Sequence, residues 1–235
     1  MKLAIIIGGS RGLGLAVCEQ YRSAGWQVLE CSRSGRGEGH IDLDLANIDL
    51  STYTSVLRQL AVQDWDEVVL INNAATITPI KPLAKQSHAA LLEALQINFI
   101  SAISLIHGFV VAFAQHRARK VVAQISSGAA QRPIASWSTY CACKAGLDHF
   151  MAVLAQEQRV AKHPILAIVI DPDVMDTDMQ AQIRASTNDD FADLPRFIAR
   201  KEQGLLRTPD EVARFCLQAI ALAEQGCRYD IELGL

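Results

Sequence analysis

The sequence predicts an α/β fold in which a doubly wound parallel sheet of about seven strands carries helices on both faces within a single domain. Short apolar, β-branched runs alternate with longer stretches of helical pattern. The runs lack polar alternation, which is typical of strands buried on both faces. Strands and helices that alternate along a chain form such a sheet through right-handed crossovers.

Five of the apolar runs predict strands, and their ranges are 3–7, 27–31, 68–71, 121–125 and 165–170. A sheet of about seven strands also needs a last strand, expected over 228–233, and a third strand ahead of Asp44, which the family resemblance described below implies.

Five helices are predicted between these strands, over 13–24, 53–62, 89–115, 139–159 and 210–224. Gly25 follows the first helix, where glycine commonly ends a helix. Thr208, Pro209 and Glu211 open the last helix with an N-cap hydroxyl, a first-turn proline and a capping-box carboxylate.

The segment 176–207, called the lid segment below, differs from the rest. It is charged, it contains Pro195, and it lies between the sixth strand and the last helix. We expect one domain over 1–235, with the lid segment as a mobile cover of the substrate site.

Composition and charge exclude several classes of protein. The chain has 235 residues, with 22 Lys and Arg against 25 Asp and Glu, so the basic footprint of a nucleic-acid-binding protein is absent. Its six cysteines form no CxxC pair and its six histidines share no ligand spacing, which favours reduced thiols in a cytoplasmic protein without a metal. The apolar stretch 97–115 carries polar residues such as Asn98 and fits a buried helix better than a membrane span.

The turn after the first strand has glycine at positions 8, 12 and 14. Glycine there permits a tight turn and close approach to a pyrophosphate, which the N-terminus of the next helix then holds. A glycine frame by itself is weak evidence, because strand–turn–helix units also use glycine for turning alone.

The residues at the tip of the second strand favour NADP(H) over NAD(H). An acid there would accept a hydrogen bond from a free ribose hydroxyl, but the tip carries Ser32 and Arg33, with Arg11 in the glycine turn. Guanidinium groups suit a 2′-phosphate, which an acid would repel. The alternative is that Arg33 and Arg36 are solvated loop charges. Glu30 complicates the interpretation, because it should share a face with Ser32.

Tyr140 and Lys144 are the sharpest chemical signal. At positions i and i+4 of a helix they share one face, and the ammonium is expected to lower the pKa of the phenol. Tyr140 then becomes a proton donor or acceptor near neutral pH. Ser127 ends the fifth strand, at the edge of the sheet where ligands bind, and could hold a substrate carbonyl. Asn98 is an awkward polar group in an apolar helix and needs a partner.

These motifs resemble those of the short-chain dehydrogenase/reductase family over essentially the whole chain. The pattern TGxxxGxG is answered by residues 7–14, NNAG by 72–75 and PGxVxT by 172–177. The resemblance places the catalytic Asn, Ser, Tyr and Lys on Asn98, Ser127, Tyr140 and Lys144. It implies that Tyr140 is the general acid, that Lys144 lowers its pKa and binds the nicotinamide ribose, that Ser127 positions the carbonyl, and that Asn98 supports a proton-relay water.

The resemblance and the glycine turn together define a cofactor site. It comprises Gly8, Ser10, Arg11, Gly12, Leu13, Gly14, Ser32, Arg33, Asp44, Leu45, Asn73, Ala74, Ala75, Tyr140, Lys144, Pro172, Met175 and Thr177. Asp44 falls where the family meets the adenine amino group. Three positions depart from the family: Ile7 lacks a hydroxyl, Ala75 replaces glycine, and Asp173 puts a carboxylate near the cofactor.

Within the family, segments such as 136–141 and 176–180 resemble the sepiapterin reductase-like branch, and most of all the bacterial benzil reductases that form (S)-benzoin. This implies an NADPH-dependent carbonyl reductase acting on a vicinal diketone, with Ser127, Trp137, Tyr140 and Met179 at the substrate. A pterin is less favoured, because the expected C-terminal acid falls on Leu233, with Glu232 pointing the other way in a strand.

Alternatives remain open at this point: the same chemistry on a pterin, a sugar or a 3-oxoacyl thioester, or a regulator that binds NADP without turnover. The resemblance also implies a homodimer or homotetramer built partly on the helices over 89–115 and 139–159.

Overall fold

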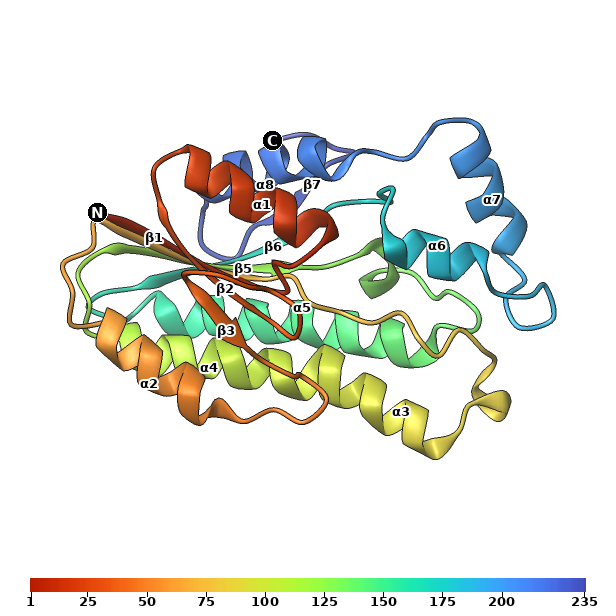
Figure 1. Ribbon diagram of the computed structural model, residues 1–235, viewed down its shortest axis with the longest axis horizontal. Coiled ribbons are helices and arrows are strands. Elements are labelled where there is room, and N and C mark those ends of the chain that lie inside the picture. The colour runs from red at the N-terminus through yellow and green to blue at the C-terminus, as the bar shows by residue number, and fades with distance from the viewer.

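The computed structural model describes residues 1–235, which form three layers: helices, one sheet and helices (Figure 1). The sheet has seven strands, all parallel, in the order β3-β2-β1-β4-β5-β6-β7. The strands are β1 (Lys2–Ile7), β2 (Gln27–Ser32), β3 (His40–Asp42), β4 (Glu67–Asn72), β5 (Arg119–Ile125), β6 (Ile165–Asp171) and β7 (Arg228–Asp230). The predicted fold class is therefore confirmed.

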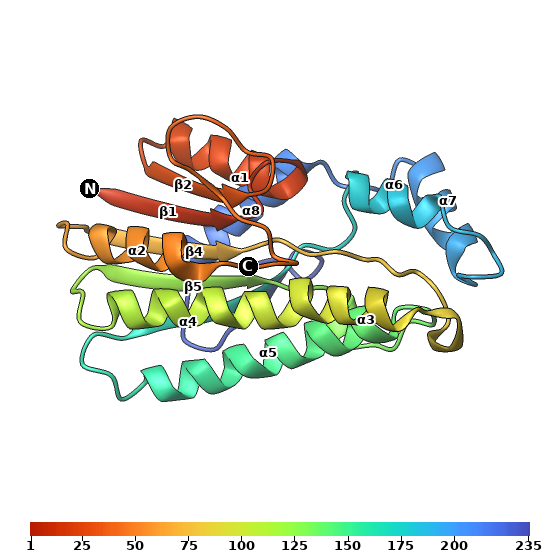
Figure 2. The same cartoon turned by 60° about the horizontal axis from the view of Figure 1, so that its bottom comes forward.

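The helices lie in two layers and one outlying group. They are α1 (Gly12–Ser23), α2 (Leu50–Leu60), α3 (His88–Leu95), α4 (Ser101–Phe113), α5 (Ser138–Gln158), α6 (Asp178–Arg184), α7 (Leu194–Glu202) and α8 (Pro209–Ala221). Single 3₁₀ turns occupy Leu83–Lys85 and Gly128–Ala130. Figure 2 shows α1 and α8 on one face of the sheet, α4 and α5 on the other, and α6 and α7 projecting beyond the sheet.

Alternate residues of each strand serve the two faces, as the pleat requires. Leu3, Ile5 and Ile7 of β1 belong to the core under α2, α4 and α5, whereas Ala4 and Ile6 belong to the core under α1 and α8. All five side chains are fully buried. The absence of polar alternation in the sequence thus reflects a sheet that is covered on both sides.

The long apolar helix predicted over 89–115 is interrupted. A π-helical turn, Gln96–Ile100, separates α3 from α4, and Asn98 lies within it. The stretch His88–Phe113 is long and apolar enough to cross a membrane by length and composition alone. Its inner residues, among them Leu105, Phe109 and Phe113, are fully buried in the core against the sheet, as expected for a core helix of a folded domain.

The capping box of α8 forms as predicted, with the Thr208 hydroxyl accepting from the Glu211 N–H and the Glu211 carboxylate accepting from the Thr208 N–H. The last strand is shorter than predicted: β7 ends at Asp230, and the chain turns back at residues 231–234. The residues after Asp230 therefore do not follow strand alternation.

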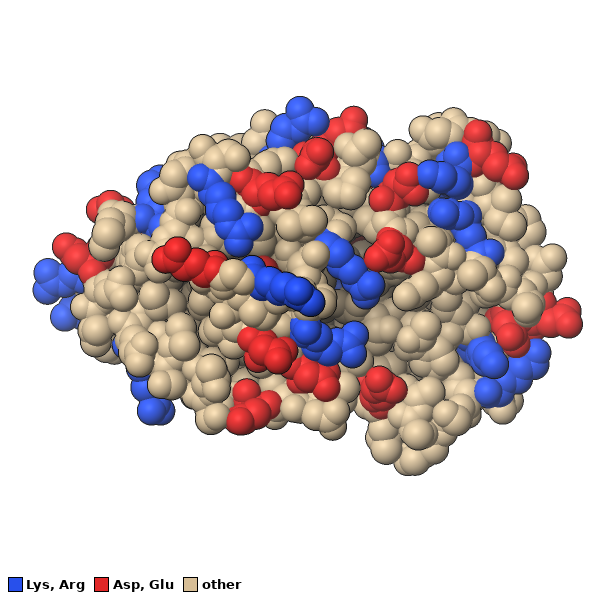
Figure 3. Space-filling view, viewed as in Figure 1, with Lys and Arg blue, Asp and Glu red and all other residues tan.

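Charged side chains of both signs are interspersed over the face seen in Figure 3. No field of a single sign covers that face, in keeping with the net charge of −3.

Candidate active site

Two cavities meet along the carboxyl edge of the sheet. The larger, about 660 Å³, lies over the glycine turn and the tip of β2, and the smaller, about 500 Å³, lies over the ends of β5 and β6. The residues that line both are Asn73, Ala75, Met175, Thr177 and Met179. The two cavities thus form one continuous cleft beside the point between β1 and β4 where the strand order reverses, the usual ligand position in doubly wound sheets.

The glycine turn has the shape of a dinucleotide cradle. Gly8 has φ +82° and Gly12 has φ +53°, conformations that favour glycine. A Cβ on Gly8 would lie 2.8 Å from that of Ala74, and one on Gly14 would lie 2.0 Å from the Gly8 carbonyl oxygen. Gly14 therefore packs the helix against the turn rather than lining the cleft.

The N-terminus of α1 is free to bind an anion. Its N-cap residue, Arg11, makes no side-chain capping hydrogen bond, so the first N–H groups of a 12-residue helix face the larger cavity without a side-chain acceptor. Together with the absent Cβ atoms, this arrangement fits the pyrophosphate of a nicotinamide dinucleotide. The chain's own residues therefore fit the cofactor that the sequence predicts.

The missing hydroxyl at Ile7 is compensated by the main chain. The Ile7 carbonyl accepts hydrogen bonds from the N–H groups of Asn73 (3.2 Å) and Ala74 (2.9 Å). The Asn73 side-chain amide donates to the Gly8 carbonyl at 2.9 Å. The glycine turn is tied to the loop after β4 without a side-chain hydroxyl at position 7.

Ser32 and Arg33 lie at the edge of the larger cavity. The Ser32 hydroxyl accepts from the N–H groups of Ser34 (3.4 Å) and Gly35 (3.0 Å) and so shapes the loop after β2. Arg33 is exposed, lines the cavity, and makes no ion pair. Its guanidinium is available for a phosphate.

Glu30, the residue that complicated the cofactor prediction, does not line the cleft. Its carboxylate is buried, accepts the Gly9 N–H at 2.9 Å, and lies 2.7 Å from Nδ1 of His40. A Cβ on Gly9 would lie 2.6 Å from Cγ of Glu30, and a Cβ on Gly35 would lie 1.9 Å from its Oε2. Both oxygens are occupied, so Glu30 supports the turn and does not face the ribose.

The other predicted cofactor residues lie around the same cleft. Asp44, whose carboxylate accepts from the Ala46 N–H at 3.1 Å, lines the larger cavity beside Leu45. Pro172 lines the smaller one, and Met175 and Thr177 lie where the two cavities meet.

Ser127, Tyr140 and Lys144 all line the smaller cavity. Ser127 follows β5, while Tyr140 and Lys144 lie one turn apart on α5, as the i and i+4 spacing predicts. The Lys144 ammonium donates to the Ile125 carbonyl at 2.7 Å and lies 5.6 Å from the centre of the Tyr140 ring. The structure thus brings these three groups to one wall.

The lowered pKa expected for Tyr140 is not found in this structure, because burial decides the net direction. Burial raises the pKa of Tyr140 well above its ordinary value, and an interaction with the Ser127 hydroxyl only partly opposes it. Burial lowers the pKa of Lys144 to about 8, while the carboxylates of Asp148 and Asp171 act in the opposite direction. Tyr140 is therefore a neutral phenol here, the form that can give up a proton.

Asn98 lies close to the predicted site, and its amide is hydrogen-bonded to the main chain of Thr76. The side chain is buried in the π-helical turn; its Oδ1 accepts from the Thr76 N–H and its Nδ2 donates to the Thr76 carbonyl, both at 2.8 Å. The polar group thus finds its partner in the loop after β4. Its side chain positions the wall of the cleft at Thr76.

Two aromatic side chains of the lid segment pack at the smaller cavity without having been predicted from the sequence: Phe197 lines it, and Phe191 is fully buried behind it. Trp137 stacks on Phe191, with ring centres 5.2 Å apart and an interplanar angle of 12°, and contacts Tyr140 edge-on at 5.8 Å. Phe197 packs against both. Met179 also lines the cavity, as predicted, together with Trp137. Only tertiary packing brings positions 191 and 197 to Tyr140.

The premise that disfavoured a pterin is also wrong. Because β7 ends at Asp230, Glu232 is not held by strand alternation, and both Asp230 and Glu232 line the smaller cavity. Neither forms an ion pair within the chain.

Asp173 is neutralised from the lid segment. It has φ +53° where the family has glycine, its N–H donates to Oδ1 of Asp171 at 3.2 Å, and its carboxylate lies 3.3 Å from the guanidinium of Arg200 on α7. The carboxylate therefore lies at the substrate side and is balanced by Arg200.

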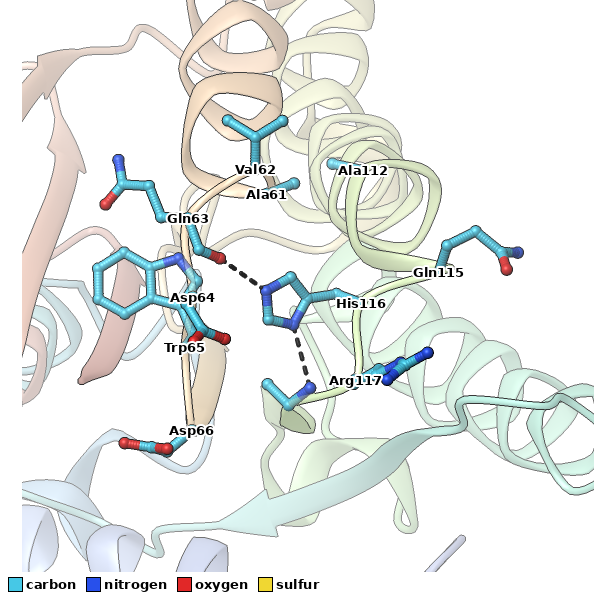
Figure 4. A pocket seen from close by; sticks show the side chains of 11 residues that line it. Ala61, Val62, Gln63, Asp64, Trp65, Asp66, Ala112, Gln115, His116 and Arg117 are labelled. Carbon is cyan, nitrogen blue, oxygen red and sulfur yellow. Dashed lines mark hydrogen bonds between the residues drawn. The ribbon is translucent and has the colours of Figure 1, made fainter.

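A third cavity, about 600 Å³, lies at the opposite, amino end of the sheet, between the loops that precede β4 and β5 (Figure 4). Nδ1 of His116 accepts from the Ala118 N–H at 3.0 Å, so Nε2 carries the proton that is donated to the Gln63 carbonyl at 2.9 Å. His116 is thus a satisfied neutral imidazole that joins the two loops. Nothing in this cavity resembles the groups of the main cleft.

Known proteins with a similar sequence or structure agree with this geometry. Residues 2–188 match the family of the short chain dehydrogenases. The benzil reductase ((S)-benzoin forming) of Bacillus subtilis is 37% identical over 99% of both chains, and that of Bacillus cereus is 32% identical over 91% of this chain and 92% of its own. A short-chain dehydrogenase/reductase structure from Saccharomyces cerevisiae matches with a TM-score of 0.81 at 24% identity, over 98% of this chain and 96% of its own, which shows the fold. A dinucleotide-shaped cleft, a Ser–Tyr–Lys wall and these likenesses together establish that the chain belongs to the short-chain dehydrogenase/reductase family and is an oxidoreductase acting on CH–OH or C=O groups.

Proposed function

We propose that the chain is an NADPH-dependent carbonyl reductase whose substrate is a vicinal diketone such as benzil, reduced to the hydroxyketone. The observation that carries this proposal is the single wall formed by Ser127, Tyr140 and Lys144 in a cavity that opens into the dinucleotide-shaped one. The benzil reductases that resemble the chain over nearly its full length support the substrate class.

A nicotinamide cofactor held in the larger cavity would supply the hydride for the carbonyl carbon. The chain's own residues manage the proton and the orientation. The Ser127 hydroxyl donates to the carbonyl oxygen and holds it, and the neutral Tyr140 phenol gives that oxygen its proton, so that one hydride and one proton convert the ketone to an alcohol. The Lys144 ammonium stabilises the phenolate left behind. Asn98 keeps the neighbouring wall in place through Thr76.

The preference for NADP(H) is supported by charge at the adenosine end of the cleft. Arg11 and Arg33 line that end, and no carboxylate at the tip of β2 faces it because both oxygens of Glu30 are engaged elsewhere. A 2′-phosphate would find the unpaired guanidinium of Arg33 and the Ser32–Ser34 loop, with Arg11, which pairs with Asp178 at 3.3 Å, beside them.

The preference for an aromatic diketone is supported by the packing at the other end. Trp137, Phe191 and Phe197 form an aromatic cluster beside Tyr140, and Met179 lies on the same cavity. Flat apolar substituents on both sides of a dicarbonyl group can pack against such a surface.

A pterin is the second candidate, and one observation favours it. Glu232 lines the substrate cavity without an ion pair, so a carboxylate is available to an amino group on a substrate. A pterin substrate and a diketone differ in whether they need this carboxylate.

The remaining properties follow the same resemblance. We propose a homodimer or homotetramer in the cytoplasm, in which the lid segment 176–207 covers the substrate. All six cysteines are free thiols, which suits a reducing compartment.

The test is consumption of NADPH by the purified chain with benzil, diacetyl and sepiapterin, followed by absorbance, with NADH in parallel. Rapid turnover of benzil is expected. Replacing Tyr140 with Phe is expected to lower kcat by about 100-fold or more, because the proton donor is lost, while cofactor binding stays intact. Cofactor binding without turnover of any carbonyl would point instead to a regulator.

Tyr140→Phe has a matched control in Tyr21→Phe, since Tyr21 lies on α1, is buried in the core between α1 and the sheet, and does not line the cleft. Faster turnover of sepiapterin than of benzil, abolished by Glu232→Gln, would favour the pterin.

A further inference from the structure

Arg228, the first residue of β7, bridges two carboxylates behind the catalytic wall. Its Nη1 contacts Oδ2 of Asp148 on α5, and its Nη2 donates to Oδ2 of Asp171 at the end of β6 at 2.6 Å. The side chains of Arg228, Asp148 and Asp171 are only 21%, 20% and 6% exposed. Three elements are thus joined by one guanidinium away from bulk solvent.

The same guanidinium reaches the end of β5. Its Nη1 lies 3.4 Å from the Ser126 hydroxyl, which itself donates to Oδ1 of Asp148 at 2.6 Å, and its Nη2 lies 3.5 Å from the Ser127 carbonyl. Ser127, which carries the proposed carbonyl-binding hydroxyl, is therefore held through its own carbonyl group and through the side chain of Ser126.

Lys144 lies next to this network but is not part of it. Asp148 follows Lys144 by four residues on α5 and so lies on the same helix face, one turn further along. The only hydrogen-bond acceptor of the Lys144 ammonium is the Ile125 carbonyl, a neutral group, although the side chain is buried. A buried ammonium with no paired carboxylate depends on nearby charges to remain protonated.

The charged and titratable groups that face Lys144 come from every element around it. They are Tyr140, Cys143 and Asp148 on α5, Asp171 on β6, and Arg228 on β7 behind the two carboxylates. Two cations and two carboxylates balance in this group. Removing a carboxylate makes the electrostatic potential at Lys144 more positive, and removing Arg228 makes it more negative.

We propose that Asp148, Arg228 and Asp171 form a positioning network that sets the charge of Lys144 and fixes the strand end that carries Ser127. The inference rests on the proposed function, in which Lys144 and Ser127 act on the substrate. Asp148 favours the protonated form of Lys144. Arg228 limits that effect because its positive charge is paired with both carboxylates. None of the three needs to touch the substrate for the catalytic groups to depend on them.

The direct test is a titration of the Lys144 side chain by NMR, with lysine labelled at the ε carbon and Lys144→Met used to assign the signal. In Asp148→Asn the pKa of Lys144 is expected to fall by about one pH unit or more, since an opposite charge at this range is lost. In Arg228→Gln it is expected to rise. The double variant is expected to return toward the wild-type value. Glu157→Gln, an exposed site three turns further along α5 without an ion pair, is the matched control.

Two further variants keep the test decisive if Arg228→Gln folds poorly. Asp148→Asn preserves the shape of the side chain and one acceptor oxygen, and it removes the charge together with one of the two hydrogen bonds that Asp148 accepts from Ser126 and Arg228. Arg228→Lys preserves the charge but cannot bridge Asp148 and Asp171 with two nitrogens, so it is expected to leave the Lys144 titration near wild type while lowering kcat/KM. If Arg228→Lys instead restores most of the kcat/KM that is lost in Arg228→Gln, the charge alone matters and the role assigned to strand positioning is rejected.

The outcomes separate this inference from the proposed function. The charge-setting role is overturned if the pKa of Lys144 is the same in wild type, Asp148→Asn and Arg228→Lys, and if Arg228→Gln either has that same pKa or does not fold. The NMR titration needs no substrate. If the pKa of Lys144 falls in Asp148→Asn and rises in Arg228→Gln but the chain reduces none of the tested carbonyls, the charge-setting network is supported and the proposed reductase activity is rejected. In an active enzyme the alkaline limb of kcat/KM must move with the NMR value; a limb that stays in place would overturn the link to catalysis.

Discussion

Glu30 illustrates how the surroundings of one side chain decide what it does. By sequence it is an acid near the tip of β2, where an acid would select a cofactor without a 2′-phosphate. In the fold its two oxygens are used by the Gly9 N–H and by His40, and Gly9 and Gly35 lack the Cβ atoms that would displace it. The negative charge is therefore directed under the turn, and Arg33 is left as the charged group at the cavity edge.

Arg33 yields a prediction with an internal control. Arg33→Ala is expected to raise KM for NADPH by about tenfold or more while changing KM for NADH little, because hydrogen bonds to a charged phosphate are lost. Arg36 lies three residues further along the same loop, is also exposed, and does not line the cavity.

Steady-state kinetics with both cofactors on the two variants checks this prediction. Equal effects of Arg33→Ala on the two cofactors, or an equal effect of Arg36→Ala, would contradict the preference for NADP(H).

Lys144 sets the expected pH dependence of the free enzyme. Its pKa is lowered to about 8 by burial, so the ammonium is present below that pH and lost above it. The pKa of Tyr140 is raised, so the phenol keeps its proton throughout the same range. We expect kcat/KM for ketone reduction to be flat near neutral pH and to fall as the pH rises through about 8.

A pH profile of kcat/KM at limiting ketone checks this, with benzil and diacetyl compared to remove effects of the substrate. A profile that stays flat well above pH 8 would show that the charge of Lys144 is not needed for reduction.

At the scale of elements, the sequence predicted the ends of helices correctly where the residues that form the end lie close together in the chain. Glycine and capping residues ended α1 and opened α8 as predicted, because these interactions lie within a few residues of each other. The π-helical turn at 96–100 and the early end of β7 were not foreseen. Both depend on partners far away in sequence: Asn98 bonds to Thr76, and the Asp171 carbonyl accepts from the Ile231 N–H.

The lid segment is held to the body of the domain through α7. Arg200 pairs with Asp173, and Lys201 pairs with Asp176, in the loop between β6 and α6 that borders both cavities. We expect Arg200→Ala to raise KM for the ketone by about twofold to tenfold, because a partly buried ion pair that holds α7 over the substrate is lost. Hydrogen exchange in α7 should increase in the same variant.

Arg196→Ala is the control for that experiment. Arg196 is on the same helix, is exposed, and has no ion pair in the fold. A rise in KM and exchange that is equal in the two variants would mean that Asp173 does not hold the lid segment.

At the scale of the whole molecule, apolar side chains on α3, on the π-helical turn and on α4 remain uncovered. Leu92, Ile100 and Val111 are 51%, 50% and 61% exposed on the helices that cover one face of the sheet. In a homo-oligomer built on this layer they would be buried. Val111→Glu is expected to shift the chain toward a monomer, since a charge in a buried contact is destabilising.

Light scattering coupled to size-exclusion chromatography measures this directly. Val160→Glu is the control, because Val160 is 91% exposed and follows the end of α5. A wild-type chain that is monomeric at all accessible concentrations would contradict the proposed assembly.

The sequence by itself determined the order of strands and helices, the glycine turn, and the one-turn spacing of Tyr140 and Lys144, because each depends on periodicity or on residues close together in the chain. Only the tertiary structure decided which groups share the substrate cavity, which partners engage Glu30 and Asp173, and that burial raises the pKa of Tyr140. Those outcomes depend on solvent exclusion and on groups brought together from positions 10 and 27 residues apart, and the local sequence pattern carries no record of such contacts.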